Sequence, residues 1–518
     1  MSNRKVLVRN ISSNLSGYSL NLVVGLLLSP FVVSSLGDGF FGVWTLIRSL
    51  TGYYGVLDFG LLGAVSHYVT RYITKSDVQG VNRTISTAMG ILAGVALVAT
   101  FFTLIFSFSS QQWFSERGFH STDLQWALVI TGLSVSLNLP LVLFRAIPYS
   151  LQRLDILNMV GIGTKLLEAG LTVLVLNAGY GILGITIVYA VTSAIAWGAH
   201  IYLAYSLYPA LSISLTTFSS SSLKELFGFG LWSTIINTAE KTVFFSDSLL
   251  VGFFLTVEAV TYYAIGGNLV PYYLALIQAI TWAITPLATA RNAQGDEAAL
   301  RQILLIGTGG TVALGTIVGA GMILLGNDFL SLWMGEKYVS GMTYTSSASI
   351  LTILTLATFL RIIQSCGFQI LFGMGKVKYL AFLAILEILV NLILSILFIK
   401  FFGLIGVAFG TLIAAILVRG FLQPRYVLKV TKVSLWNYLS QIGLASIPII
   451  TVMVFVNWLM ATFQHIAGWT DFLIRALGVA VPALLVGLYT SVPIGVRDQG
   501  RLLLLGKLGF LKKSEETF

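Results

Sequence analysis

Fourteen long apolar stretches follow one another along this chain of 518 residues, with short polar connections between them. Only 10% of the residues are charged, whereas a soluble domain carries about 25%. A helix of about 20 apolar residues spans the hydrocarbon core of a bilayer. The sequence therefore predicts an all-α integral membrane protein with about 14 transmembrane helices. Their approximate ranges are 14–36, 40–68, 84–107, 124–147, 155–177, 181–206, 226–254, 259–289, 303–325, 344–372, 377–400, 403–422, 437–461 and 471–492.

Most lysines and arginines of the connections, Arg419 among them, lie on one side of this predicted membrane. The other side holds only Arg117, Lys337 and Lys400. Basic connections favour the cytoplasmic side, so we expect both termini in the cytoplasm. The net charge of +10 reflects topology, and its dispersal over many connections does not favour nucleic-acid binding. The single cysteine, Cys366, excludes a multi-thiolate metal site, and we expect no metal or cofactor.

The chain repeats weak patterns at an offset of about 220 residues. Arg71 and Arg291 each end a long second helix, and Gly181-Ile182-Leu183-Gly184 recurs as Gly403-Leu404-Ile405-Gly406. Repeats with an even number of spans share one orientation and commonly place the substrate site at their interface. The predicted organisation has two six-helix bundles, two additional helices and a basic cytoplasmic tail. Their boundaries are 1–215, 216–430, 431–492 and 493–518.

Five basic and five acidic side chains that lie inside or against the apolar stretches are the candidates for function. A cation in the middle of a bilayer costs about 2.5–3.5 kcal/mol on insertion scales, so such residues normally face a partner or a wet cavity. We expect the basic ones to line a central, substrate-binding cavity, and the acidic ones are candidates for ion coupling. The basic residues are Arg48, Arg145, Lys165, Lys241 and Arg361. The acidic residues are Asp58, Glu168, Glu240, Asp247 and Glu387.

Simpler roles are open for several of these residues. Lys165 and Glu168 have the i,i+3 spacing of a helical ion pair. Asp58 can cap local polar groups, and Arg145 can extend to the inner membrane interface. Arg361 has no acid on its own helix, which makes it the firmest candidate for substrate contact.

The segment from Leu36 to Trp44 (LGDGFFGVW) and the following segment from Tyr53 to Leu61 (YYGVLDFGL) resemble the N-terminal part of bacterial polysaccharide flippases. These are the Wzx-type flippases of the MOP superfamily, which also contains MATE exporters and lipid II flippases. The resemblance implies alternating access and movement of an undecaprenyl-diphosphate-linked oligosaccharide from the cytoplasmic to the outer leaflet of the bacterial plasma (inner) membrane. It also implies basic residues that engage the diphosphate, a role carried over to Arg48, Lys165, Lys241 and Arg361. Membrane lipid, a polysaccharide polymerase and glycosyltransferases are the implied partners.

Two alternatives stay open. A MATE-like antiporter of organic cations would use the buried acids. A glycan polymerase needs a large outer connection with catalytic side chains, and the longest here, about residues 108–123, is short. No phosphate-cradling glycine loop for ATP occurs, so we expect a transporter and not an enzyme.

Overall fold

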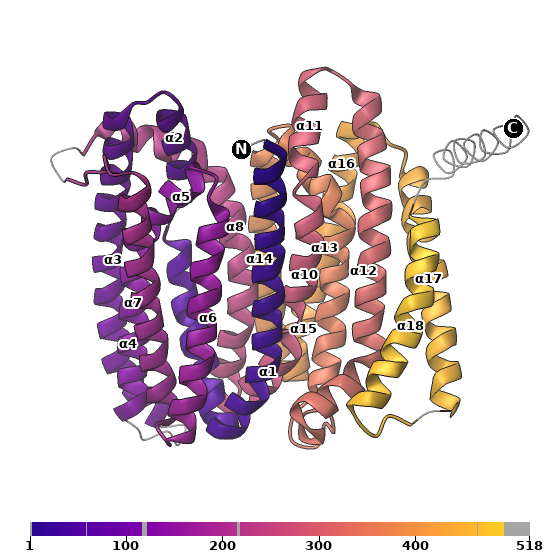
Figure 1. The fold of residues 1–518 in the computed structure, drawn as a ribbon. Coiled ribbons are helices and arrows are strands. Elements are labelled where there is room, and N and C mark those ends of the chain that lie inside the picture. The colour runs from indigo at the N-terminus through magenta and orange to yellow at the C-terminus, as the bar shows by residue number, and fades with distance from the viewer. Residues whose placement is uncertain (1–2, 59, 116–121, 215–217, 464, 492–518) are drawn as a thin grey trace, which may run out of the picture. The chain divides into compact units, whose positions relative to one another are not determined.

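The computed structural model describes residues 3–58, 60–115, 122–214, 218–463 and 465–491, and these contain helices and short connections without a β-strand. Figure 1 shows the helices as long, closely aligned rods. Twelve helices of the described residues are long and apolar enough to cross a membrane. The prediction of an all-α, multi-pass membrane protein is therefore confirmed.

The count of twelve differs from the fourteen predicted stretches for two local reasons. The first predicted helix and the start of the second are joined in one element, α1 (Asn3–Gly52). This element has a non-helical kink at Gly37, with φ 73° and ψ 167°. The predicted seventh helix is α8 (Ser220–Phe254). It carries Glu240, Lys241 and Asp247, which lower its hydropathy.

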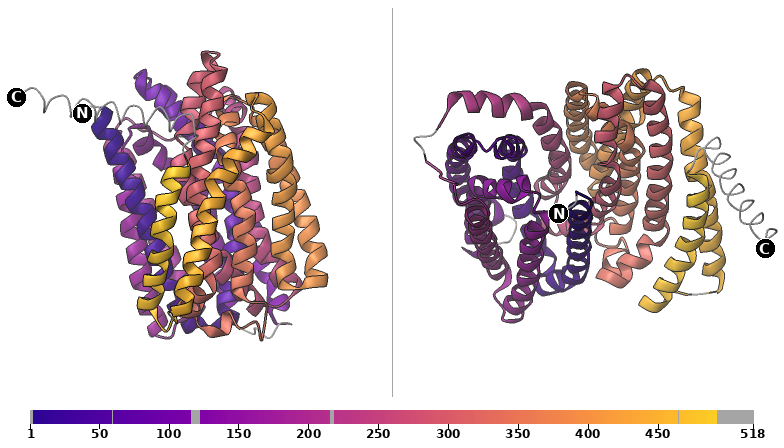
Figure 2. Two further views of the ribbon diagram at one scale, coloured as in Figure 1. Left: turned by 90° about the vertical axis from the view of Figure 1, so that its right-hand side faces the viewer. Right: turned by 45° about the horizontal axis from the view of Figure 1, so that its top comes forward.

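The chain forms two compact units, Met1–Ala264 and Ile265–Phe518. The first unit contains α1, α8 and the helices that lie between them in the chain (Figures 1 and 2). These are η1 (Tyr53–Val56), α2 (Leu61–Thr74), α3 (Val78–Ser115), α4 (Thr122–Leu141), η2 (Val142–Arg145), α5 (Ala146–Ser150), α6 (Leu154–Asn177) and α7 (Gly181–Leu207).

The core of the first unit lies between α2, α3 and the η2–α5 segment. Its fully buried members include Val65, Ile85, Leu92 and Leu143. The predicted second helix, 40–68, is interrupted here, because α1 ends at Gly52 and α2 begins only at Leu61. After this interruption α2 packs against α5 and η2, and this packing determines which side chains meet there.

The second unit contains the end of α9 (Val257–Gly267) and the helices that follow it. They are α10 (Val270–Thr281), α11 (Ile284–Ala293), α12 (Glu297–Met334), η4 (Glu336–Tyr338), α13 (Ser347–Gly373), α14 (Val377–Phe402), α15 (Leu404–Ala415), the π-helix η5 (Ile416–Leu422), α16 (Gln423–Thr431), α17 (Leu435–Phe463) and α18 (Trp469–Thr490).

Within this unit α12 is the central helix. Its residues Val312 and Ala313 pack in one core cluster with Ala445 and Ile449 of α17 and Val479 of α18. Small residues let a neighbour approach closely: Tyr273 of α10 donates its hydroxyl to the carbonyl of Gly315 at 2.7 Å.

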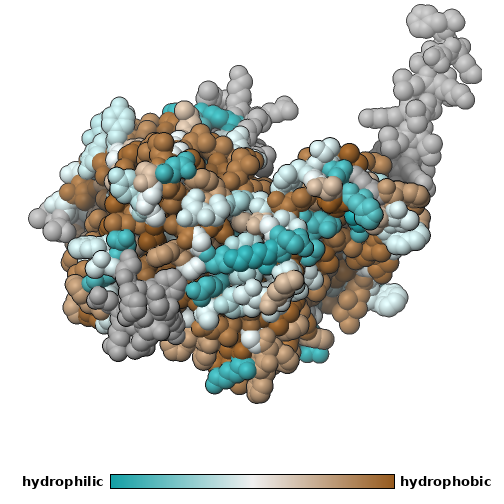
Figure 3. Space-filling view, turned by 90° about the horizontal axis from the view of Figure 1, so that it is seen from below, coloured by the Kyte–Doolittle hydropathy of each residue, from teal (hydrophilic) through white to brown (hydrophobic). Residues whose placement is uncertain are grey.

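Large apolar side chains are widely exposed on both units, including Leu97 (74%), Phe101 (61%) and Leu488 (72%). Hydrophobic residues also dominate the outline in the space-filling view of Figure 3, where hydrophilic residues gather in smaller patches. A soluble monomer rarely exposes contiguous apolar surface on this scale. Contact with lipid accounts for it.

The repeated glycine motif has the same local structure in both places. Gly181 and Gly403 both have positive φ, 52° and 61°, which favours glycine. Gly184 and Gly406 both lack room for a side chain, the first against Tyr180 and the second against the carbonyl of Phe398. This likeness supports the predicted duplication. The boundaries 1–215 and 216–430 stay a prediction, and the predicted basic tail 493–518 and residues 116–121 lie outside the described residues.

Candidate functional site

Three charged side chains meet in the interior of the second unit and form an ion triad, Arg361–Glu387–Arg419. Arg361 lies on α13, Glu387 on α14 and Arg419 on η5. Glu387 Oε1 lies 2.9 Å from Nη2 of Arg361, and Glu387 Oε2 lies 2.7 Å from Nη2 of Arg419. The exposed fractions of the side chains are 17% for Arg361, 3% for Glu387 and 7% for Arg419. Arg361 is thus the most accessible member.

The prediction that Arg419 belongs to the basic residues of the connections is wrong, because its side chain lies in the interior beside Glu387. It lies on the π-helix η5, and its side chain is 7% exposed; π-helical turns inside α-helices are frequent at functional sites. Arg419 Nη1 also donates to Gln423 Oε1 at 2.8 Å. The unpaired charge of Glu387 in a long apolar helix was the signal that could have pointed to this partner.

A polar chain continues from the triad toward α17. Gln423 donates to the carbonyl of Gln364 at 3.2 Å, and Gln364 donates to the hydroxyl of Tyr438 at 3.1 Å. Buried polar groups are costly unless they are hydrogen-bonded. These polar contacts therefore hold η5 and α16 against α13 and α17, and they hold the Arg419 side chain in place.

The triad carries one positive charge in excess, because two guanidinium groups share one carboxylate. Arg419 contacts both Glu387 and Gln423, whereas Arg361 contacts Glu387 through Nη2. A guanidinium presents five N–H donors in a planar fork that matches phosphate and carboxylate oxygens. This geometry allows Arg361 to bind an anion while its side chain stays paired with Glu387.

Two of the local alternatives for the first unit are confirmed. Lys165 Nζ lies 3.1 Å from Glu168 Oε2, and both side chains are 27% exposed. Asp58 Oδ1 accepts a hydrogen bond from the backbone N–H of Gly60 at 2.8 Å, in the turn between η1 and α2. Both contacts join residues that are close in sequence.

The charged residues of α8 lie in different surroundings. Asp247 is 4% exposed and accepts a hydrogen bond of 2.6 Å from the hydroxyl of Tyr263 on α9. Glu240 is half-buried and Lys241 is exposed. Asp247 is therefore the acid of this helix that is removed from solvent.

Arg48 lies on the exposed side of α1. Its Cζ atom is 6.0 Å from the centre of the Trp44 ring, within the range of a cation–π contact. The Trp44 ring in turn meets Tyr189 edge-on, with ring centres 6.5 Å apart.

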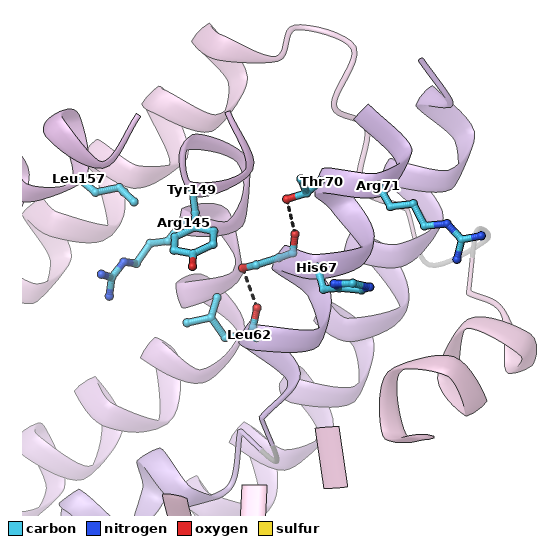
Figure 4. A pocket seen from close by; sticks show the side chains of 9 residues that line it. Leu62, His67, Thr70, Arg71, Arg145, Tyr149 and Leu157 are labelled. Atoms are coloured by element: carbon cyan, nitrogen blue, oxygen red, sulfur yellow. Dashed lines mark hydrogen bonds between the residues drawn. The ribbon is translucent and has the colours of Figure 1, made fainter. Parts of the chain in front are cut away.

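Arg145 lines a cavity of about 750 Å³ within the first unit, together with residues of α2, Tyr149 of α5 and Leu157 of α6. Figure 4 shows Arg145 and Arg71 with their guanidinium groups directed away from each other, and His67 between the two. The other predicted basic residues do not line this cavity. A single cavity shared by all five stays a prediction. Among the described residues there is no group of three potential metal ligands.

The comparisons with known proteins agree with this fold and charge pattern. The family described as "Polysaccharide biosynthesis protein" matches residues 73–343, which is more than half of the chain. The protein belongs to this family. The expected resemblance of the chain to bacterial polysaccharide flippases is thereby confirmed.

Two proteins with similar sequences are named as a transporter and a flippase. A "Putative O-antigen transporter" of Shigella flexneri is 24% identical over 429 residues, covering 81% of this chain and 97% of that protein. A "Probable flippase AglR" of Haloferax volcanii is 23% identical, covering 60% of this chain and 61% of that protein. Neither name denotes an enzyme, in agreement with the expected transporter.

Solved structures show the same fold at low sequence identity. An inward-facing MATE family transporter of the MOP superfamily has a TM-score of 0.62 and 17% identity, covering 80% of this chain and 95% of that one. The lipid II flippase MurJ in an inward closed conformation has a TM-score of 0.61 and 18% identity, covering 91% and 99%. At these identities the likeness is one of fold alone.

Proposed function

We propose that this protein moves undecaprenyl-diphosphate-linked oligosaccharide units from the cytoplasmic to the outer leaflet of the bacterial inner membrane, by alternating access, for surface polysaccharide biosynthesis. The observation that carries the proposal is the match to an O-antigen transporter along 97% of that protein. The match to the family described as "Polysaccharide biosynthesis protein" supports the same substrate class.

The charges of the second unit fit the chemistry of such a substrate. A diphosphate loses its hydration when it enters a membrane interior, and this costs free energy unless cations and hydrogen-bond donors replace the water. The triad supplies one net positive charge at Arg361, which is partly exposed while its carboxylate partner is buried. Of the predicted cations, Arg361 is our proposed contact for the diphosphate.

A transport assay in vesicles tests the proposal directly. The purified chain is placed in vesicles with a radiolabelled undecaprenyl-diphosphate oligosaccharide, and a membrane-impermeant glycosidase is added outside. We expect the protected inner fraction to become digestible within minutes, whereas protein-free vesicles keep about half of the label protected. Equal protection with and without protein would rule out flipping of this substrate.

The alternative of a MATE-like exporter rests on the shared fold. It is separated by a second measurement, in which cells lacking the gene are compared with complemented cells. The flippase predicts loss of surface polysaccharide with unchanged sensitivity to cationic drugs, and the exporter predicts the reverse. The proposed cytoplasmic termini are tested in the same cells with reporter fusions at each end.

A further inference from the structure

The cavity beside Arg145 is a built pocket in the first unit that differs in composition from the Arg361–Glu387–Arg419 triad. Its walls come from one face of α2, from the η2–α5 segment and from α6. Leu62, Ser66 and Thr70 are spaced by four residues and so lie on the same side of α2. The volume of about 750 Å³ is in the range of sites for drug-sized ligands.

The donors that line this pocket are basic or phenolic. Arg71, Arg145, His67 and Tyr149 line it, and no acidic side chain is among the described lining residues. Within the described chain, neither Arg71 nor Arg145 has a carboxylate within ion-pair distance. An anion is the ligand that this set of groups stabilises.

The hydroxyl groups of the pocket add a second requirement. Ser66 donates to the carbonyl of Leu62 at 2.8 Å and Thr70 to that of Ser66 at 2.7 Å (Figure 4). Their hydrogens are thus used inside α2, and toward the pocket these oxygens act as acceptors. Acceptors beside cations suit a ligand that carries hydroxyl groups next to its negative charge.

We infer that this pocket binds the phosphate-bearing head group of a membrane lipid, with Arg145 as the anchor of the phosphate and the α2 hydroxyls as acceptors for a neighbouring glycerol or sugar. The phosphate comes either from an anionic phospholipid or from the diphosphate of the lipid-linked substrate. Only the second source rests on the proposed function. Leu62 and Leu157 provide the apolar wall for the start of the lipid chains.

One glycine of the pocket wall allows the pocket to be filled by a substitution. A Cβ atom added at Gly63, which lines the pocket, has no neighbour within 4 Å. Gly63→Leu therefore adds a side chain to the pocket from a Cβ position that has room. Gly94 on α3 is equally exposed and equally without neighbours within 4 Å, so Gly94→Leu is the matched control.

Binding to the purified full chain in neutral detergent tests the inference. The probes are phosphatidylglycerol, undecaprenyl diphosphate and, as a lipid without phosphate, dioleoylglycerol. We expect at least one phosphate lipid to bind more tightly than dioleoylglycerol. Loss of charge-assisted hydrogen bonds predicts that Arg145→Gln weakens this binding about 10- to 100-fold, with Arg145→Lys intermediate. Gly63→Leu abolishes it and Gly94→Leu leaves it unchanged.

The outcomes separate the sources and the proposal from its alternatives. Binding of phosphatidylglycerol alone identifies a phospholipid site, and binding of undecaprenyl diphosphate alone identifies a substrate site. The inference is overturned if no phosphate lipid binds, if dioleoylglycerol binds equally well, or if binding is insensitive to either Arg145→Gln or Gly63→Leu. The binding assay does not depend on transport. A negative flipping assay would therefore contradict the proposed function without contradicting the pocket.

Discussion

Arg419 and Glu387 are joined by two contacts to the same carboxylate oxygen, although they lie 32 residues apart in the chain. Arg419 Nε donates to Glu387 Oε2 at 2.8 Å and Nη2 lies 2.7 Å from it. The other oxygen, Oε1, is left for Arg361 at 2.9 Å. Each arginine thus has its own oxygen, and Glu387 is the member on which both cations depend.

Glu387→Gln is expected to destabilise the protein strongly. It leaves two arginines close together in the interior with no counter-charge, and removal of one partner from a buried ion pair costs about 3–5 kcal/mol. The measurement is thermal unfolding in detergent. Glu168→Gln is the control, because the Lys165–Glu168 pair is 27% exposed on both sides and exposed pairs contribute about 0–1 kcal/mol. Equal unfolding temperatures for the two variants would contradict this account of the triad.

Arg361→Ala is expected to decrease surface glycan export strongly at a normal protein level. Glu387 keeps Arg419 as a partner in this variant, so the interior pair stays neutral and the fold is preserved. Loss of hydrogen bonds to a charged group predicts a decrease in flipping rate of about 10- to 100-fold. Lys400→Gln, on the exposed end of α14, removes a charge elsewhere and should leave the rate unchanged. Unaltered export by Arg361→Ala would remove Arg361 from the mechanism.

Asp247 is the acid that we expect to carry an ion, if transport is driven by a gradient. It is 4% exposed and accepts a hydrogen bond from the hydroxyl of Tyr263. Asp247→Asn keeps an acceptor for Tyr263 but loses the charge. In vesicles with an imposed proton or sodium gradient, the ratio of driven to undriven transport should fall to about one. Asp58→Asn should keep the normal ratio, because asparagine also caps the Gly60 turn; a normal ratio in Asp247→Asn would exclude Asp247.

Gly403→Ala is expected to destabilise the second unit at the start of α15. Gly403 has φ 61° and ψ −137°, and holding a residue with a side chain in such a conformation costs about 1–3 kcal/mol. Thermal unfolding provides the measurement. Gly161→Ala on α6 is the control, since Gly161 has no positive φ and no neighbour within 4 Å of an added Cβ. It should be neutral or stabilising.

The local features of this protein could be predicted from its sequence. The long apolar stretches specify membrane-spanning helices, because a helix satisfies its own backbone hydrogen bonds inside the bilayer. The pairing of Lys165 with Glu168 and the Asp58 cap depend on spacings of three and two residues, which helix and turn geometry determine. Gly181 and Gly403 were visible as a repeated motif for the same reason.

The tertiary structure alone decided which distant charges meet. The sequence alone indicates that Arg419 belongs to a cytoplasmic connection, but in the structure Arg419 donates to Glu387. Asp247 accepts a hydrogen bond from Tyr263, which lies 16 residues away in the chain. The break between η1 and α2 likewise created the wall of the Arg145 pocket. Hydropathy is a property of each segment by itself, so the sequence determined that the helices lie in a membrane. The partner of a buried charge depends on helix rotation and packing, and these are set by contacts between segments that are far apart in the chain.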